Sequence, residues 1–213
     1  MPVSRVDRAL CIGLAVFFAV GVIGHLLPDT RPLMLGLTPL ALLLTAGVVA
    51  IPLVEERRGA VALWAGAAFL FGFALEAVGV ATGLVFGAYS YGSVLGPKLL
   101  GVPLVIGLNW PLVILGAVAF AVRFLRNPLA AAAAAGVFTA GFDWVLEPFA
   151  VSAGYWTWQA GEIPVRNYIA WFLIAVLVAW VFASKKLSVR SPVPSIAVGV
   201  QLVFFSLLRI LGA

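Results

Sequence analysis

Three carboxylic acids stand inside long apolar stretches of this 213-residue chain. Asp143 and Glu147 are four residues apart, so a helix would place them on one face. Glu76 lies in a second apolar stretch, and Asn109 lies in a third. Ionisable groups inside a membrane are costly and are usually functional, and a carboxyl group can give or take a proton. The four residues predict acid–base chemistry within a membrane, and the alternative is that they hydrogen-bond between helices and only hold them together.

The composition indicates that these acids lie in a membrane protein. Hydrophobic residues make up 64% of the chain and charged residues 10%, whereas a soluble domain is about half apolar and a quarter charged. A cytosolic enzyme and a disordered chain are therefore excluded. The 13 basic residues are scattered and form no patch, so nucleic acid is not an expected partner. One Cys and one His give no ligand cluster for zinc or haem, so no metal site is expected.

Seven apolar stretches are long enough to span a bilayer, which needs about 20 residues each. We expect spans at 7–27, 32–54, 60–84, 103–122, 128–151, 167–184 and 193–212. The expected fold is an all-α, polytopic membrane helical bundle of about seven transmembrane helices, forming one integral membrane domain over residues 1–213. The first stretch follows basic residues, as in a signal peptide, but its length favours an uncleaved span. The second stretch contains Pro39 and Pro52, which neighbouring helices can tolerate.

The basic residues predict the orientation of the spans. With a cytoplasmic N-terminus, nine basic residues lie on the inner side: Arg5, Arg8, Arg57, Arg58, Arg123, Arg126, Lys185, Lys186 and Arg190. Four lie on the outer side: Arg31, Lys98, Arg166 and Arg209. Because positive residues favour the cytoplasmic side, we expect a plasma-membrane protein with its N-terminus cytoplasmic and its C-terminus outside.

This orientation places the polar residues at similar depths. At about 1.5 Å per residue, Glu76 lies about 24 Å from the inner face of a hydrocarbon core about 30 Å thick. By the same rise, Asp143 lies about 22 Å and Glu147 about 28 Å from the inner face. Asn109 lies about 9 Å below the outer face. All four therefore fall in the outer half, which predicts a single site there.

Two blocks of the sequence repeat one order of features. Each block has an acid-bearing span, an aromatic loop and a span with Asn and Trp near its start. The corresponding residues are Leu75-Glu76, Gly83, Tyr89, Tyr91, Asn109 and Trp110 in one block, and Leu146-Glu147, Gly154, Trp156, Trp158, Asn167 and Trp171 in the other. Both blocks start on the same side, which indicates a parallel repeat with a site at the interface of its halves. We predict that the three acids and Asn109 converge on one cavity, with these residues nearby: Tyr89, Trp110, Trp144, Trp156, Asn167 and Tyr168.

Several motifs in these blocks resemble a family of membrane proteins of carotenoid biosynthesis, whose named members are carotenoid 1,2-hydratases. They are YSY at 89–91, LGPKL at 95–99, GVPLVIGLNW at 101–110, DWVLEP at 143–148, GYWTW at 154–158 and NYIAWF at 167–172. The resemblance covers residues 70–175. It implies a cofactor-independent hydro-lyase that adds water across the terminal 1,2 double bond of a linear carotenoid, giving a tertiary alcohol. The implied partners are the carotenoid, water, membrane lipids and other enzymes of carotenoid biosynthesis.

Hydration of such an alkene requires a proton donor to carbon, support for a tertiary cation and a positioned water. We expect Asp143 to donate the proton, Glu147 or Glu76 to act as base, and Asn109 to help position the water. Aromatic faces can stabilise the cation. The expected substrate-binding residues are Tyr89, Tyr91, Trp110, Trp144, Tyr155, Trp156, Trp158, Asn167, Tyr168 and Trp171. Three other functions remain open: a carotenoid cyclase, a small proton-coupled membrane transporter and a non-catalytic scaffold.

Overall fold

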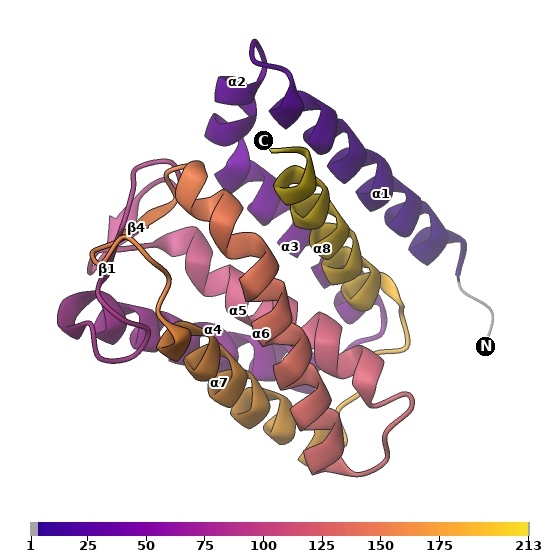
Figure 1. Cartoon of the computed structure of the whole chain (residues 1–213). Helices are drawn as coiled ribbons and strands as arrows, with labels where there is room; N and C mark the ends of the chain where they lie inside the picture. The colour runs from indigo at the N-terminus through magenta and orange to yellow at the C-terminus, as the bar shows by residue number, and fades with distance from the viewer. Residues whose placement is uncertain (1–3, 213) are drawn as a thin grey trace.

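The protein is a bundle of helices, and a computed structural model describes its residues 4–212 (Figure 1). The helices are α1 (Arg5–Leu26), α2 (Arg31–Gly36), α3 (Thr38–Glu55), α4 (Gly59–Thr82), α5 (Leu104–Ala121), α6 (Pro128–Ser152), α7 (Val165–Ser184) and α8 (Val193–Leu211). Four short strands lie between them: β1 (Tyr89–Tyr91), β2 (Lys98–Leu99), β3 (Val102–Pro103) and β4 (Trp156–Trp158).

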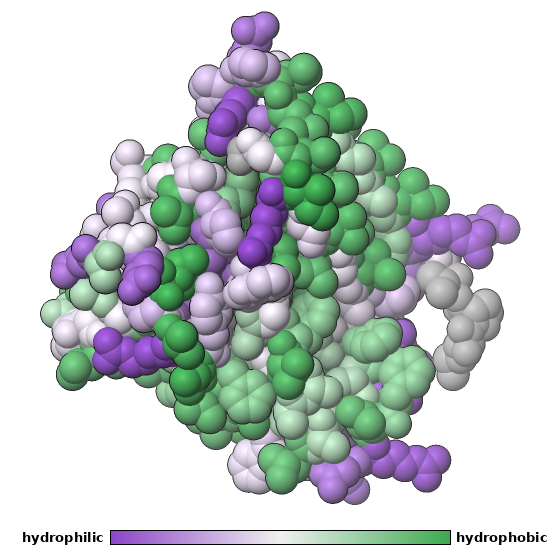
Figure 2. Space-filling view, in the orientation of Figure 1, coloured by the Kyte–Doolittle hydropathy of each residue, from purple (hydrophilic) through white to green (hydrophobic). Residues whose placement is uncertain are grey.

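Seven of these helices, all except α2, are long and apolar enough to cross a membrane. The predicted all-α membrane bundle is therefore confirmed, and the protein is an integral membrane protein. Figure 2 shows apolar side chains along the exposed flank of α1, and polar side chains gathered towards the ends of the bundle. Such a surface suits a lipid environment, because apolar side chains that face lipid need no cover from other protein segments.

Helix α5 forms the centre of the bundle. In its most apolar 18-residue window 78% of the residues are buried, whereas the other six spans have between 17% and 44% buried. It contacts α3, α4, α6, α7 and α8. Close packing of these helices uses small residues, as expected where no water drives association. At Gly116, for example, an added Cβ atom would lie 2.4 Å from a Val198 methyl group.

Local sequence explains where the helices begin. Asn127 caps α6, because its side-chain oxygen accepts hydrogen bonds from the backbone of Leu129 at 2.8 Å and Ala130 at 3.2 Å. The stretch 32–54, predicted as one span, instead forms two helices, with α2 ending at Gly36 and α3 beginning at Thr38. Pro39 explains this correction: its ring and missing N–H suit the first turn of a helix and not its interior.

The connections 85–102 and 152–166 contain short strands that the sequence analysis did not predict. Strand β1 pairs antiparallel with β4, and β2 pairs with β3 in a hairpin. In the first pair, Ser90 lies opposite Thr157, with Tyr89 opposite Trp158 and Tyr91 opposite Trp156. This register is symmetric about the central pair, so a two-fold axis there would exchange the two strands. The pairing thus joins the aromatic loops of the two repeated blocks at one end of the bundle (Figure 1).

A glycine with positive φ follows the acid-bearing helix in each block. Gly83 caps the end of α4 with φ +67°, and Gly154 follows α6 with φ +71°. A residue with a Cβ atom is strained in this left-handed conformation, which explains the glycine at both places. Each glycine turns the chain from its helix towards the aromatic strand that follows. The two strands are thereby brought over the acids of α4 and α6.

Candidate functional site

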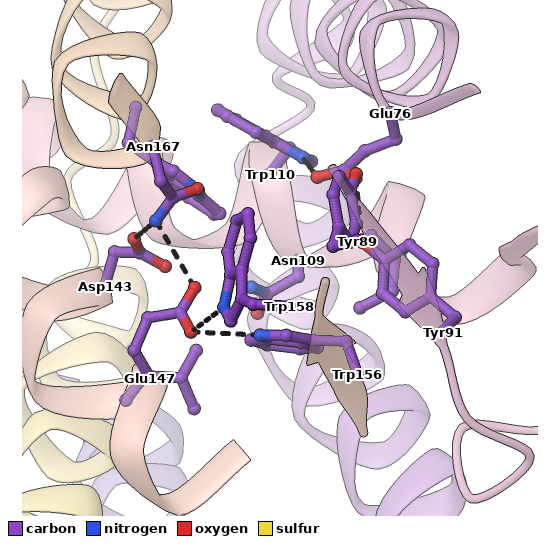
Figure 3. A pocket seen from close by; sticks show the side chains of 13 residues that line it. Glu76, Tyr89, Tyr91, Asn109, Trp110, Asp143, Glu147, Trp156, Trp158 and Asn167 are labelled. Atoms are coloured by element: carbon purple, nitrogen blue, oxygen red, sulfur yellow. Dashed lines mark hydrogen bonds between the residues drawn. The ribbon is translucent and has the colours of Figure 1, made fainter. Parts of the chain in front are cut away.

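A small cavity lies among α4, α5, α6 and α7 and is covered by β1 and β4 (Figure 3). Its lining residues are Glu76, Tyr89, Tyr91, Ile106, Asn109, Trp110, Asp143, Leu146, Glu147, Trp156, Trp158, Asn167 and Trp171. The structure therefore brings the three acids and Asn109 to one cavity. Its space for water-sized molecules is about 30 Å³, and about 10–15 Å³ of such space holds one water. The cavity has room for about two water molecules.

Asp143 and Glu147 form a pair joined by one amide group. Asn167 Nδ2 lies 2.5 Å from Asp143 Oδ2 and 3.3 Å from Glu147 Oε1, and it donates a hydrogen bond to each. Both acids are 1% exposed, and Asn167 is 2% exposed. The second oxygen of Asp143, Oδ1, receives no hydrogen bond from any residue that the structure describes. One oxygen of this buried acid is thus free for another partner in the cavity.

Glu147 is surrounded by groups that can only donate hydrogen bonds. The indole Nε1 atoms of Trp156 and Trp158 each donate to Glu147 Oε2 at 3.0 Å, in addition to the amide of Asn167. An ionised carboxylate only accepts hydrogen bonds, and an indole N–H only donates them. The surroundings of Glu147 therefore suit a carboxylate anion.

Glu76 has an equivalent set of donors on the opposite side of the cavity. The hydroxyl groups of Tyr89 and Tyr91 both donate to Glu76 Oε2, the second at 2.7 Å, and Trp110 Nε1 donates to Oε1 at 3.1 Å. Burial, and then the nearby Glu76 carboxylate, raises the pKa of both tyrosine hydroxyls. These hydroxyls therefore keep their protons and act as donors. Figure 3 shows Trp158 standing between this group and the Asp143–Glu147 pair.

Aromatic rings form much of the remaining wall. Trp110 and Trp171 stack face to face, with ring centroids 3.8 Å apart and planes 10° apart. The ring centroids of Tyr89 and Trp158 lie 5.1 Å apart across the paired strands. Faces of electron-rich rings attract positive charge, so this wall can stabilise a cation that forms in the cavity.

The repeated blocks give matching contacts, with one difference. Glu76 and Glu147 each accept hydrogen bonds from the two aromatic residues of their own block's strand. Asp143 has no counterpart, because the residue at the same offset in the first block is Gly72. Trp110 fills that space: a Cβ atom added to Gly72 would lie 2.8 Å from its ring. The repeat thus provides two similar carboxylates but only one carboxylate pair.

Three of the predicted site residues do not line the cavity. Trp144 is 55% exposed on α6 and packs against Arg209, whose guanidinium carbon lies 4.2 Å from the ring centroid. Tyr155 points into a different cavity, and its hydroxyl lies 2.9 Å from Thr38 Oγ1. Tyr168 is half-buried beside the site. None of the three forms part of the cavity wall, because neighbours along a helix or strand point in different directions, and their expected role in substrate binding stays a prediction.

Other features of the site were only partly visible in the sequence. Asn109 lines the cavity but is half-buried and makes no side-chain hydrogen bond within the described residues. Ile106 and Leu146 line the cavity as well, and no chemical signal marks such apolar residues. Pro148 frees a backbone carbonyl one turn earlier, and the Arg209 guanidinium donates to that oxygen, on Trp144, at 2.8 Å. In residues 4–212 no group of three His, Cys, Asp or Glu side chains could hold a metal ion.

The fold and site together define a polytopic α-helical membrane protein with a buried pair of carboxyl groups in an aromatic cavity. A family model described as carotenoid biosynthesis protein matches residues 37–212, and the chain belongs to this family. The bisanhydrobacterioruberin hydratase of Haloarcula japonica is 34% identical to the chain over 145 residues, which are 63% of this chain and 48% of that protein. The chain therefore spans about half the length of this curated relative. No solved structure matches this chain.

Proposed function

We propose that the protein is a hydro-lyase that adds water across the terminal 1,2 double bond of a linear carotenoid, giving a tertiary alcohol. The observation that carries this proposal is the buried Asp143–Glu147 pair, with room for water beside it and an aromatic wall around it. The hydratase that the chain resembles supports the proposed substrate class.

Asp143 is the proton donor in this proposal. Its Oδ1 atom has no hydrogen-bond donor within the described residues, so this oxygen can carry the proton that protonates the alkene carbon. A proton on Asp143 also avoids two charged carboxylates that share one buried amide. The proton forms a new C–H bond at the less substituted alkene carbon. The positive charge then lies on the tertiary carbon, near the stacked rings of Trp110 and Trp171.

Glu147 is the general base. Its three donors favour the carboxylate form, which can take a proton from water as the water oxygen bonds to the tertiary carbon. The atoms balance: one proton leaves Asp143, one proton reaches Glu147, and one water is added to the carotenoid. A return of the proton from Glu147 to Asp143, one helical turn away, restores the starting state. Asn167 keeps the pair in place, and Asn109 is a candidate to hold the water.

The small volume of the cavity constrains how the substrate binds. A space of about 30 Å³ holds water but not the branched end of a carotenoid. Part of the aromatic wall must therefore move when the end group binds. Trp156 and Trp158 belong to a two-stranded pairing between long connections and not to a helix, so we expect this cover to move.

The basic residues support a plasma-membrane orientation with the N-terminus cytoplasmic and the site in the outer half.

The experiment that tests the proposal is expression of the chain in cells that make lycopene, followed by mass analysis of the extracted pigments. A gain of one water molecule per modified end supports hydration. Cyclisation leaves the mass unchanged because it only isomerises the carotenoid, so a cyclic product of unchanged mass would replace hydratase with cyclase. Unmodified lycopene together with proton-coupled flux in proteoliposomes would favour a transporter.

A further inference from the structure

Helix α8 lines no part of the carboxylate cavity, yet it contacts the turn of α6 that carries two of the acids. The Phe205 ring packs against Phe142 and Phe149, with ring centroids 5.9 Å and 5.8 Å apart. These two partners stand on either side of the segment 143–148 in the chain. One turn further along α8, Arg209 reaches the same segment. Helix α8 therefore holds the acid-bearing turn from outside the cavity.

Pro148 weakens the backbone of this turn. A helix normally pairs each carbonyl with the N–H group four residues later, and proline has no N–H group. The Trp144 carbonyl therefore lacks its helical donor, and this residue lies between Asp143 and Glu147 in the chain. The Trp144 side chain is 55% exposed on a membrane-spanning helix, and a backbone group without a partner is costly in lipid. The missing bond thus falls within the segment that fixes the spacing of the two acids.

Arg209 supplies the missing donor. Its Nη1 atom donates to the Trp144 carbonyl oxygen at 2.8 Å, and its guanidinium carbon lies 4.2 Å from the centroid of the Trp144 ring. A planar guanidinium can stack on an aromatic ring and still donate hydrogen bonds in its own plane, so the two contacts together fix its direction. Arg209 and Phe205 are four residues apart and lie on one face of α8. Arg209 thus holds both the backbone and the side chain of Trp144.

The proposed proton transfers depend on the spacing of the two acids. Asn167 donates to Asp143 at 2.5 Å and to Glu147 at 3.3 Å, so a small shift of the turn would break the longer bond first. A displacement of about 1 Å can slow an enzyme by about 100-fold. We propose that Arg209 is a positioning residue, which sets the geometry of the acid pair by replacing the backbone donor that Pro148 lacks. This inference rests on the proposed hydration.

Four proteins form a double-mutant cycle that tests this role. They are the native chain, Arg209→Met, Pro148→Ala and the chain with both substitutions. Arg209→Met keeps an unbranched side chain but removes the donor, so we expect kcat for hydration per folded molecule to fall about 10- to 100-fold, with KM within about twofold of native. Pro148→Ala restores the helical N–H group, so adding Arg209→Met to it should change kcat by less than about threefold.

Two further variants separate the hydrogen bond from the charge and from folding. Arg209→Lys keeps a positive charge and a donor, so it should recover most of the kcat that Arg209→Met loses. Arg31→Met removes another basic residue of the predicted outer side, at the start of α2, and should leave kcat within about twofold of native. A role of Arg209 in folding alone would lower the yield of Arg209→Met and leave its kcat per folded molecule unchanged.

Infrared spectroscopy reports on the acid pair without using hydration. The carboxyl bands of the pair are those lost in Asp143→Asn and in Glu147→Gln. We expect Arg209→Met to shift these bands in the native background and to leave them in place in the Pro148→Ala background. Shifted bands in a protein that leaves every carotenoid unchanged would keep the positioning role of Arg209 and remove only the proposed reaction.

The outcomes that overturn the positioning role are distinct from failure of the hydratase proposal. Unshifted bands in Arg209→Met, or a native kcat where the protein hydrates its substrate, would show that the contact with Trp144 does not hold the pair. An equal loss in the native and Pro148→Ala backgrounds would show that Arg209 acts through its charge and not through the carbonyl. If Arg209→Met does not fold, rescue of folding by Pro148→Ala supports the proposal, and failure of the double variant to fold overturns it.

Discussion

The substitution Asp143→Asn separates the proposed chemistry from packing. Asn has the size of Asp and can still accept the hydrogen bond that Asn167 donates to Asp143 Oδ2 at 2.5 Å. It cannot donate an acidic proton from the position of Oδ1, however. We therefore expect the variant to insert and fold while hydration is lost.

The two effects differ enough in size to be told apart. Replacing a hydrogen bond to a charged or acidic group by a neutral one costs about 1 kcal/mol, a modest part of a typical stability of about 5–15 kcal/mol. Loss of a general acid slows a reaction by about 100- to 10,000-fold, which corresponds to about 2.7–5.4 kcal/mol in the barrier. Lower protein yield alone would not produce a rate loss of this size.

The assay is the amount of hydrated carotenoid formed per unit of purified, folded protein. Thr139→Val is a matched control on the same helix, because Thr139 is fully buried one turn before Asp143 and bonds only to the Ala135 carbonyl at 2.8 Å. It should remain within a few-fold of native activity. If Asp143→Asn hydrates its substrate at the native rate per folded molecule, Asp143 is not the acid, and Glu76 becomes the next residue to test.

Four further predictions concern other parts of the molecule. Glu147→Gln should lower turnover by about 100-fold without loss of folded protein, because an amide cannot take a proton from water; native turnover per folded molecule would remove Glu147 as the base. Tyr89→Phe removes one of the three donors to Glu76 and should lower the free energy of unfolding by about 1.5–3 kcal/mol, measured by chemical denaturation; an unchanged value would mean that the hydroxyl is dispensable. Burial acts to raise the pKa of Glu56. The backbone N–H groups of Arg190 and Ser191 and the guanidinium of Arg58 donate hydrogen bonds to its carboxylate, and together they outweigh burial and hold the pKa below its usual 4.5. Glu56→Gln should therefore destabilise the protein at neutral pH, and the difference should disappear as the pH falls below 4.5 through the folded pKa, because the native side chain then becomes neutral too. Reporter fusions at Ser188 should be cytoplasmic and fusions at Gly161 external, and the reverse at both sites would invert the orientation.

The sequence alone determined the spans and the residues most suited to chemistry. Hydropathy is a local property, so each stretch of about 20 apolar residues indicates a helix whatever its neighbours are. The second stretch is the exception, because a proline close to its start ends one helix and begins another. Glu76, Asp143 and Glu147 stood out because charge in lipid is costly. The rise per residue of a helix also predicted that they lie at a similar depth.

Tertiary structure decided which partners these acids have. The spacing of the two blocks suggested similar sites, but only packing shows that Trp110 fills the place beside Gly72 that Asp143 occupies in the other block. The motifs also did not specify where each aromatic side chain points. Trp156 donates to Glu147, whereas its neighbour Tyr155 points into a separate cavity that Thr38 also lines. Hydrogen bonds depend on distances between segments far apart in the chain, and residue types and spacing do not specify those distances.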